Sequence, residues 1–310
     1  MRESPYPSGD VIVEILACGV CGTDLKTYRF GHPMFQPPTI LGHEAYGKVV
    51  EMKISIPGIN LGDLVAIAPY VECGSCWRCL IGIPELCQNK TVISSGCFAQ
   101  YVAMGELHAQ KALFKVQSDA PQYVLVEPLA CVLNGIEKLR DVGDVLIVGG
   151  GIMGTLFALT LRELGSQVQV VEISDWRKHF LKSREITALY PDELEREAQF
   201  TTIILTVNIP DIIEMYLAKI RDGGQLLLFA GYTKGTILKI YPYSLHDQQI
   251  TLLGSFGYSS HHFSEALAMI NQWKSSNSSL ITHQYPLESG AQAISILEKG
   301  EAMKVVLRAN

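Results

Sequence analysis

A glycine-rich turn between an apolar strand and an apolar helix constrains the fold of this 310-residue chain more than any other feature. The strand, Asp144–Val148, has no alternation of polar residues, which is typical of a parallel strand covered on both faces. After it, Gly149 permits a tight turn, Gly151 permits the close approach of a pyrophosphate, and Gly154 permits close packing of the next helix. The spacing predicts a dinucleotide-binding unit with its helix over residues 152–164.

An acidic residue at the end of the next predicted strand bears on the choice of nucleotide. Glu172 follows the strand Gln167–Val171 and stands eighteen residues after Gly154. A carboxylate there accepts hydrogen bonds from both adenosine ribose hydroxyls and repels a 2′-phosphate, which favours NAD over NADP, whereas the nearby Arg177 weakens that preference. A solvated strand end is the alternative interpretation of Glu172. The expected cofactor-binding residues are Gly149, Gly151, Ile152, Met153, Gly154, Glu172 and Arg177.

Strand-like and helix-like segments continue to alternate after this unit. Residues 201–207 and 225–230 are apolar runs, separated by the helix-like segment 211–220 and a glycine turn at 222–224. This alternation predicts an α/β domain with a doubly wound parallel sheet over residues 133–257.

The N-terminal part of the chain has a different pattern. Short apolar runs at 11–16, 47–52, 64–68 and 98–103 are separated by Gly, Pro and Asn turns, without helical periodicity between them. The pattern predicts an all-β, barrel-like domain, and a chain of this length is expected to form about two domains.

Four cysteines stand close together at C-x2-C-x2-C-x7-C spacing: Cys73, Cys76, Cys79 and Cys87. Four neighbouring thiolates are what one tetrahedral structural zinc requires. Gly74, Gly82 and Pro84 interrupt the stretch, so it buries little apolar surface and needs a metal to hold its shape. A disulfide pair or idle thiols are the alternative, which we disfavour because residues 1–10 do not resemble a secretory signal.

Three further short motifs stand in the sequence, two before the four cysteines and one between the cysteines and the glycine-rich turn. They are Cys21-Gly-Thr-Asp24, Gly42-His43-Glu44 and Glu127-Pro-Leu-Ala-Cys131. With the four cysteines and the glycine-rich unit, they make the chain resemble the zinc-dependent medium-chain dehydrogenase/reductase family, in the branch of the sorbitol, threonine and glucose dehydrogenases. Segments 254–258, 281–287 and 300–306 look like the closing segments of that family. The resemblance implies a GroES-like catalytic domain, formed by 1–132 with 258–310, and a Rossmann NAD-binding domain.

The resemblance also implies a catalytic zinc. Cys21, His43 and Glu127 match its ligands, and a thiolate and an imidazole both suit zinc. Glu44 matches a neighbouring carboxylate that is able to ligate the metal when water leaves. Cys131, four residues after Glu127, is the alternative third ligand.

Two residues near Cys21 match supporting roles in the family. Asp24 matches the carboxylate that orients the ligating imidazole, and its alternative role is a turn cap. Thr23 matches the hydroxyl that passes the alcohol proton outward, and its alternative role is a loop hydroxyl. Lys26 stands where many alcohol dehydrogenases have the histidine that ends this relay.

The resemblance implies an oxidoreductase that transfers a hydride between NAD and a secondary alcohol. Three protein ligands leave an open position on zinc, whose charge lowers the pKa of a substrate hydroxyl. A carboxylate third ligand is associated with polyol, sugar-like and amino-alcohol substrates, and these are the substrates that we expect. A dehydrogenase of simple alcohols is an alternative.

A non-catalytic relative that binds NAD or zinc for structural or regulatory ends also stays open. Such a protein need not retain Cys21, His43, Glu44 and Glu127 beside a structural zinc segment, yet all of them are present. A zinc-free quinone reductase fits less well, because such relatives lack both cysteine sets.

Charge and hydropathy limit the class of partner. The chain has 25 Lys and Arg against 31 Asp and Glu, a formal net charge of -6, and no local basic patch, so we expect no nucleic-acid partner. Glycines interrupt the apolar stretch 145–161 and residues 1–10 lack an apolar anchor, so we expect a cytoplasmic protein without a membrane partner. The candidate edge strand 250–253 favours pairing into a homodimer or homotetramer.

Overall fold

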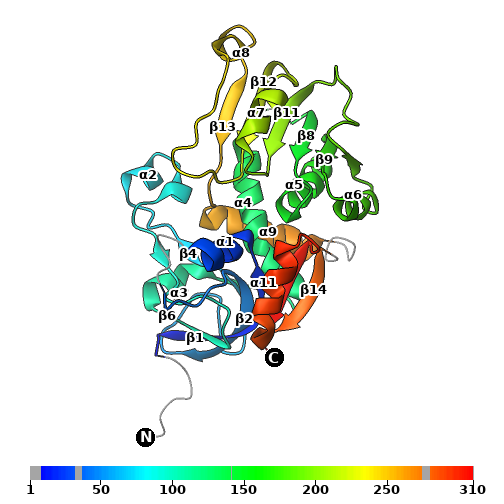
Figure 1. Ribbon diagram of the computed structural model, residues 1–310. Coiled ribbons are helices and arrows are strands. Elements are labelled where there is room, and N and C mark those ends of the chain that lie inside the picture. Colours follow the sequence, from blue (N-terminus) through cyan, green and yellow to red (C-terminus); the bar gives the residue numbers. More distant parts are fainter. Residues whose placement is uncertain (1–7, 32–36, 141, 274–279, 310) are drawn as a thin grey trace, which may run out of the picture. The chain divides into compact units, whose positions relative to one another are not determined.

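The computed structural model describes residues 8–31, 37–140, 142–273 and 280–309 (Figure 1). Contacts between Cα atoms divide the chain into two compact units. The first unit consists of Met1–Ala130 with Tyr258–Asn310, and the second is Cys131–Gly257. The division falls inside helix α4 (Val126–Glu137).

In the described residues, the first unit is built on a seven-stranded sheet in the order β14-β15-β1-β2-β3-β7, with β6 also paired to β1. Neighbouring strands are antiparallel except for the parallel pair β14 and β15. Strand β1 pairs with β2 along one edge, while β6 and β15 share its other edge. The predicted all-β domain is confirmed. Its strands are β1 (Val11–Val20), β2 (Glu44–Met52), β3 (Leu64–Ile67), β6 (Tyr101–Met104), β7 (Leu113–Lys115), β14 (Ile281–Pro286) and β15 (Lys304–Arg308).

Short helices and a two-stranded sheet complete this unit. The core of the unit contains buried Val, Ile and Ala side chains of β1, β2 and β3, which pack together. The small sheet pairs β4 (Tyr70–Val71) with β5 (Thr91–Val92) and flanks the cysteine-rich segment. The helices are α1 (Gly22–Phe30), α2 (Trp77–Leu80), α3 (Glu106–Ala112), α9 (Ser260–Gln272) and α11 (Gly290–Glu298), with 3-10 turns at Pro84–Leu86, Pro121–Leu125 and Leu287–Ser289.

Within its described residues, the second unit contains a six-stranded, fully parallel sheet in the order β10-β9-β8-β11-β12-β13. The predicted doubly wound sheet is confirmed, and β8 and β9 have the predicted bounds. Helix α5 begins at the predicted residue and ends one residue early. The strands are β8 (Asp144–Val148), β9 (Gln167–Val171), β10 (Thr187–Leu189), β11 (Phe200–Leu205), β12 (Ile220–Leu228) and β13 (Thr251–Gly254). The helices are α5 (Ile152–Glu163), α6 (Asp175–Lys182), α7 (Ile213–Leu217) and α8 (Pro242–His246), with a 3-10 turn at Pro210–Ile212.

The turn predicted at 222–224 is wrong, because β12 already begins at Ile220 and runs through it. The pairing of β12 with β11 shifts register there, since Phe200 faces Ile220 but Thr202 faces Gln225. Gly223 has a φ of 77°, a conformation that favours glycine. The glycines therefore lie in an irregular part of the strand, where β12 has four residues between the paired positions and β11 has one.

The described residues contain no helix that is both long and apolar enough to cross a membrane.

Candidate active site and metal centres

The four clustered cysteines have the geometry of a tetrahedral metal site. Their Sγ atoms lie within 4.8 Å of one another. The distance from Cys73 Sγ is 3.5 Å to Cys87 Sγ and 4.0 Å to Cys79 Sγ. Cys76 Sγ lies 3.6 Å from Cys79 Sγ and 3.8 Å from Cys87 Sγ. Four sulfurs at about 2.3 Å from one zinc lie about 3.8 Å apart in a tetrahedron, so these thiols fit the ion.

Backbone amides prepare these thiols for a cation. The N–H groups of Ser75 and Cys76 donate to Cys73 Sγ, and those of Cys73 and Asn89 donate to Cys87 Sγ. The bonds from Ser75 and Cys76 lower the pKa of the Cys73 thiol to about 6. The four clustered cysteines are free thiols. The segment therefore offers a metal at least one thiolate at neutral pH.

A second donor cluster joins Cys21, His43 and Glu44, whose ligand atoms also lie within 4.8 Å of one another. Cys21 is the N-cap of α1, and its Sγ accepts the N–H of Thr23 at 3.5 Å. His43 directly precedes β2, and Glu44 is the first residue of that strand. A thiolate, an imidazole and a carboxylate are ligand types that zinc accepts.

Asp24 holds the two segments of this cluster together. Its buried carboxylate accepts the N–H of Cys21 at 2.9 Å and the N–H of Gly42 at 3.1 Å. Its Oδ1 also lies 3.4 Å from Nδ1 of His43. A carboxylate on Nδ1 leaves Nε2 of the imidazole as the metal-binding nitrogen. This contact is the one that the predicted orienting role of Asp24 requires, and the role itself stays a prediction.

The electrostatics around His43 favour a positive charge. Burial lowers the pKa of its imidazole, but the hydrogen bonds with Asp24 and Cys21 outweigh burial and raise that pKa well above its ordinary value. The groups that stabilise the imidazolium would stabilise a bound cation in the same way. The donor set therefore fits a metal by charge as well as by ligand type.

Glu127 lies beside this cluster and outside its 4.8 Å limit. Its carboxyl group is buried in α4, and burial raises its pKa to about 7, with attraction to His43 and repulsion from Glu44 as smaller opposing effects. These interactions place Glu127 within electrostatic reach of two cluster residues. Cys131, the alternative ligand, belongs to the second unit.

Zinc affinity at this cluster is expected to fall as the pH drops below about 7. Glu127 must lose its proton to bind a cation, so zinc binding to the metal-free protein releases a proton and strengthens as the pH rises through that value. Competition with a chromophoric chelator across this pH range measures the slope. Glu127→Gln cannot titrate and should have a shallower slope. The same slope in both proteins would contradict Glu127 as a ligand.

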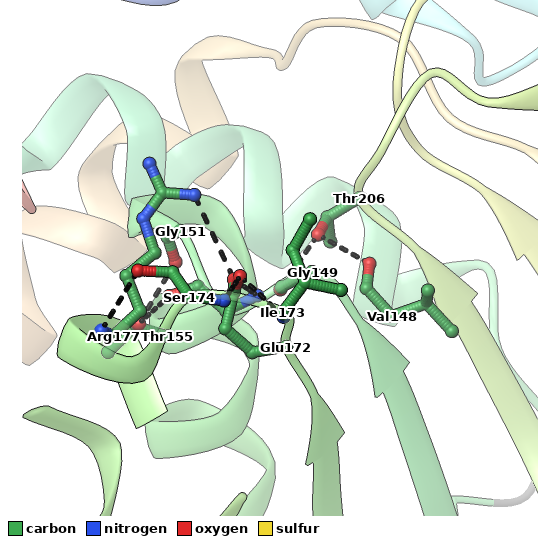
Figure 2. A network of polar contacts seen from close by, with 10 residues as sticks. Val148, Gly149, Gly151, Thr155, Glu172, Ile173, Ser174, Arg177 and Thr206 are labelled. Atoms are coloured by element: carbon green, nitrogen blue, oxygen red, sulfur yellow. Dashed lines mark hydrogen bonds and ion pairs between the residues drawn. The ribbon is translucent and has the colours of Figure 1, made fainter. Parts of the chain in front are cut away.

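The glycine-rich turn of the second unit is fixed by Glu172 (Figure 2). Oε2 of this buried carboxylate accepts the N–H of Gly150 at 2.7 Å, and Oε1 accepts the N–H groups of Ile173 and Ser174, each at 2.8 Å. Arg177 Nη1 lies 3.8 Å from Oε2. Glu172 therefore joins the end of β9 to the turn after β8, and it is not a solvated strand end.

The surroundings of two glycines explain their positions in the turn. A Cβ atom on Gly154 would lie 1.9 Å from the carbonyl oxygen of Gly149, so the close packing predicted for α5 requires glycine. Above Gly151 and apart from its chain neighbours, the only described atom within 4 Å of such a Cβ would be Nη1 of Arg177, at 4.0 Å. This open space beside the start of α5, which begins with Ile152 and Met153, fits the approach of a pyrophosphate.

Comparison with known protein families finds a match in each of the two units. Residues 7–116 match the alcohol dehydrogenase GroES-like domain, and residues 144–198 match the pyridine nucleotide-disulphide oxidoreductases. D-arabinitol dehydrogenase 1 of Uromyces fabae is 26% identical over 321 residues, covering 97% of this chain and 90% of that relative. L-threonine 3-dehydrogenase of Pyrococcus horikoshii is 27% identical over 329 residues, covering 98% and 92% respectively.

A solved structure has the same fold over nearly the whole chain. Alcohol dehydrogenase from Thermotoga maritima matches with a TM-score of 0.87 at 23% identity, covering 99% of this chain and 94% of that one. The chain belongs to the zinc-dependent medium-chain dehydrogenase/reductase family. This medium-chain dehydrogenase is an NAD(P)-dependent zinc alcohol dehydrogenase, so the predicted family and enzyme class are confirmed. Its cofactors are zinc and a pyridine nucleotide.

Sequence reasoning missed two residues of this medium-chain dehydrogenase. Lys304 forms a buried ion pair with Glu44, and Thr206 donates its hydroxyl to the carbonyl oxygens of Val148 and Gly149 at 2.9 and 3.0 Å (Figure 2). In the sequence, the segment 300–306 resembles only a closing segment of the family, and the importance of its lysine becomes visible only when the partner of that lysine is known. Thr23 and Lys26 are exposed on α1.

Proposed function

We propose that this protein oxidises a secondary alcohol of a polyol, sugar-like or amino-alcohol substrate and transfers its hydride to NAD. The observation that carries this proposal is the cluster of Cys21, His43 and Glu44, which Asp24 organises. It combines donors of the types that zinc accepts with a charge environment that favours a cation.

The chain's residues divide the work of this reaction. Cys21, His43 and Glu127 hold the catalytic zinc, which when bound acts as a Lewis acid on the alcohol. Asp24 fixes the ring direction of His43 through its contact with Nδ1. Thr23, exposed at the start of α1, accepts the alcohol proton and passes it outward.

The substrate class rests on the relatives and on the donor set. D-arabinitol and L-threonine, named in the two relatives, both carry a secondary alcohol beside polar groups. Glu127 is a carboxylate in the place of a second thiolate, and its burial near His43 and Glu44 supports it as the third ligand. A small alcohol with neighbouring hydroxyl or amino groups is therefore the proposed substrate.

Glu172 supports NAD as the nucleotide. Its buried carboxylate lies at the end of β9, where a 2′-phosphate would meet a negative charge. Arg177 partly offsets that charge, since its Nη1 lies 3.8 Å from Oε2 of Glu172. We propose NAD as the preferred cofactor, with weaker use of NADP.

We further propose a second, structural zinc, assembly into a homo-oligomer and a cytoplasmic location. The Sγ distances of the four clustered thiols support the second zinc. Strand β13 is at the end of the six-stranded sheet, which supports pairing with a second copy. A reducing compartment suits a protein whose four clustered cysteines are unbridged and act as zinc ligands.

The test measures zinc per chain and the reduction of NAD and NADP with polyols, sugar acids, amino alcohols and simple alcohols. We expect two zinc ions per chain and turnover with NAD on members of the first three groups. Turnover only on simple alcohols would contradict the substrate class. One zinc per chain without any turnover would contradict catalysis and favour a binding-only protein.

A further inference from the structure

A lysine and a glutamate form an ion pair in the interior of the first unit, beside the donor cluster. Nζ of Lys304 contacts Oε2 of Glu44, and each side chain is only 1% exposed. Nζ also lies 3.4 Å from the carbonyl oxygen of Val20. Lysine is almost never fully buried unless it is paired, so this contact accounts for the position of its ammonium group.

The register of three strands creates the space for this pair. Gly19 of β1 faces Glu44 of β2 on one side and Val306 of β15 on the other. A Cβ atom on Gly19 would lie 2.2 Å from Oε2 of Glu44 and 3.1 Å from Cε of Lys304. A side chain at this position would displace one partner, so glycine here preserves room for both.

Glu44 therefore lies between Lys304 and the other two residues of the donor cluster. Its carboxylate lies within 4.8 Å of the ligand atoms of Cys21 and His43, yet one of its oxygens contacts Lys304. Lys304 therefore compensates the negative charge of a carboxylate that could itself bind the cation.

We propose that Lys304 is a positioning residue that restrains Glu44 beside the metal site and prevents it from becoming a permanent ligand. This inference rests on the proposed catalytic zinc. Without the ammonium group, Glu44 would be a buried, unpaired carboxylate next to a divalent ion, and coordination to that ion would relieve its charge. A fourth permanent protein ligand closes a zinc site, whereas catalysis requires an open position.

The experiment compares wild-type enzyme with Lys304→Met by metal release to a chelator and by the visible spectrum of Co²⁺ at the catalytic site. We expect release from Lys304→Met to be slower by about tenfold or more, which is the scale of effects at groups that contact metal ligands. The Co²⁺ bands should change shape with the added carboxylate. The double variant Lys304→Met/Glu44→Gln should return both readouts toward wild type, and Lys304→Arg should keep them near wild type.

If Lys304→Met does not fold, the single variant Glu44→Gln tests the same inference. The amide oxygen of glutamine can still accept a hydrogen bond from Lys304, and a residue that is not a permanent ligand is dispensable for the resting metal site. We expect metal release within about twofold of wild type, well below the effect of removing a ligand, and unchanged Co²⁺ bands.

Three outcomes would overturn the inference. They are faster or unchanged release from folded Lys304→Met, loss of metal in Glu44→Gln, and a double variant that behaves like Lys304→Met. A wild-type enzyme that binds no metal at Cys21 and His43 would overturn the proposed function together with this inference. Metal binding and turnover in wild type with any of the three outcomes would overturn the inference alone.

Discussion

Cys21→Ser is expected to lose one zinc per chain and to reduce alcohol-dependent NADH formation by at least about a thousandfold. The variant replaces a thiolate of the donor cluster by a hydroxyl, which binds zinc poorly at neutral pH. A metal Lewis acid contributes several kcal/mol to such a reaction, and each 1.36 kcal/mol is about tenfold in rate. Elemental analysis and initial rates measure both effects.

Serine is chosen because it preserves the start of α1. Cys21 is the N-cap of this helix, and its Sγ accepts the N–H of Thr23. Serine is a favoured N-cap, so the helix should persist and the loss should belong to the metal. Cys131→Ser is the matched control and should keep both zinc ions. Loss of zinc from Cys131→Ser instead of Cys21→Ser would show that the ligands are assigned wrongly.

Cys76→Ser is expected to lose the other zinc and to lower the melting temperature by roughly 10 °C. This is the shift for several kcal/mol at about 2–4 °C per kcal/mol in a chain of this size. The segment around α2 has little besides a metal to order it, because none of the four residues of α2 is buried. Trp77, Leu80 and Ile81 are all exposed there. Calorimetry and limited proteolysis between residues 73 and 92 follow the change.

The effect should reach beyond the cysteine-rich segment. Glu72, directly before Cys73, accepts the backbone N–H and the hydroxyl of Ser260 at 3.1 and 3.0 Å, so it links this segment to the start of α9. Cys131→Ser again serves as the control, with an unchanged melting temperature. A Cys76→Ser protein that keeps two zinc ions and melts like wild type would exclude a structural zinc at these thiols.

The parallel sheet was the part of the fold that sequence predicted best. Strands β8 and β9 consist of apolar residues that need no particular partner to be recognised, because both of their faces are covered. The prediction around Gly223 was wrong, since a glycine pair has the same appearance in a turn and in an irregular part of a strand. Only the register against β11 distinguishes them.

Some residues of the candidate sites can likewise be predicted from the sequence, and others cannot. The spacing of the four clustered cysteines is visible in the sequence, and in the structure their thiols lie close together. Lys304 could not be found, because its significance comes from Glu44, which is far away in sequence and adjacent only after β15 and β2 pair on either side of β1. The hydrogen bond from Gly150 to Glu172 likewise depends on the placement of β9 beside β8.

The position of β15 has a consequence for biosynthesis. The donor residues Cys21 and His43 leave the ribosome early, and the whole second unit, Cys131–Gly257, is then made as one uninterrupted stretch. The strand that carries Lys304 and pairs with β1 emerges only after that unit. A growing chain can therefore finish its nucleotide-binding unit before β15 is made, whereas the pair of Lys304 and Glu44 beside the metal centre can form only afterwards.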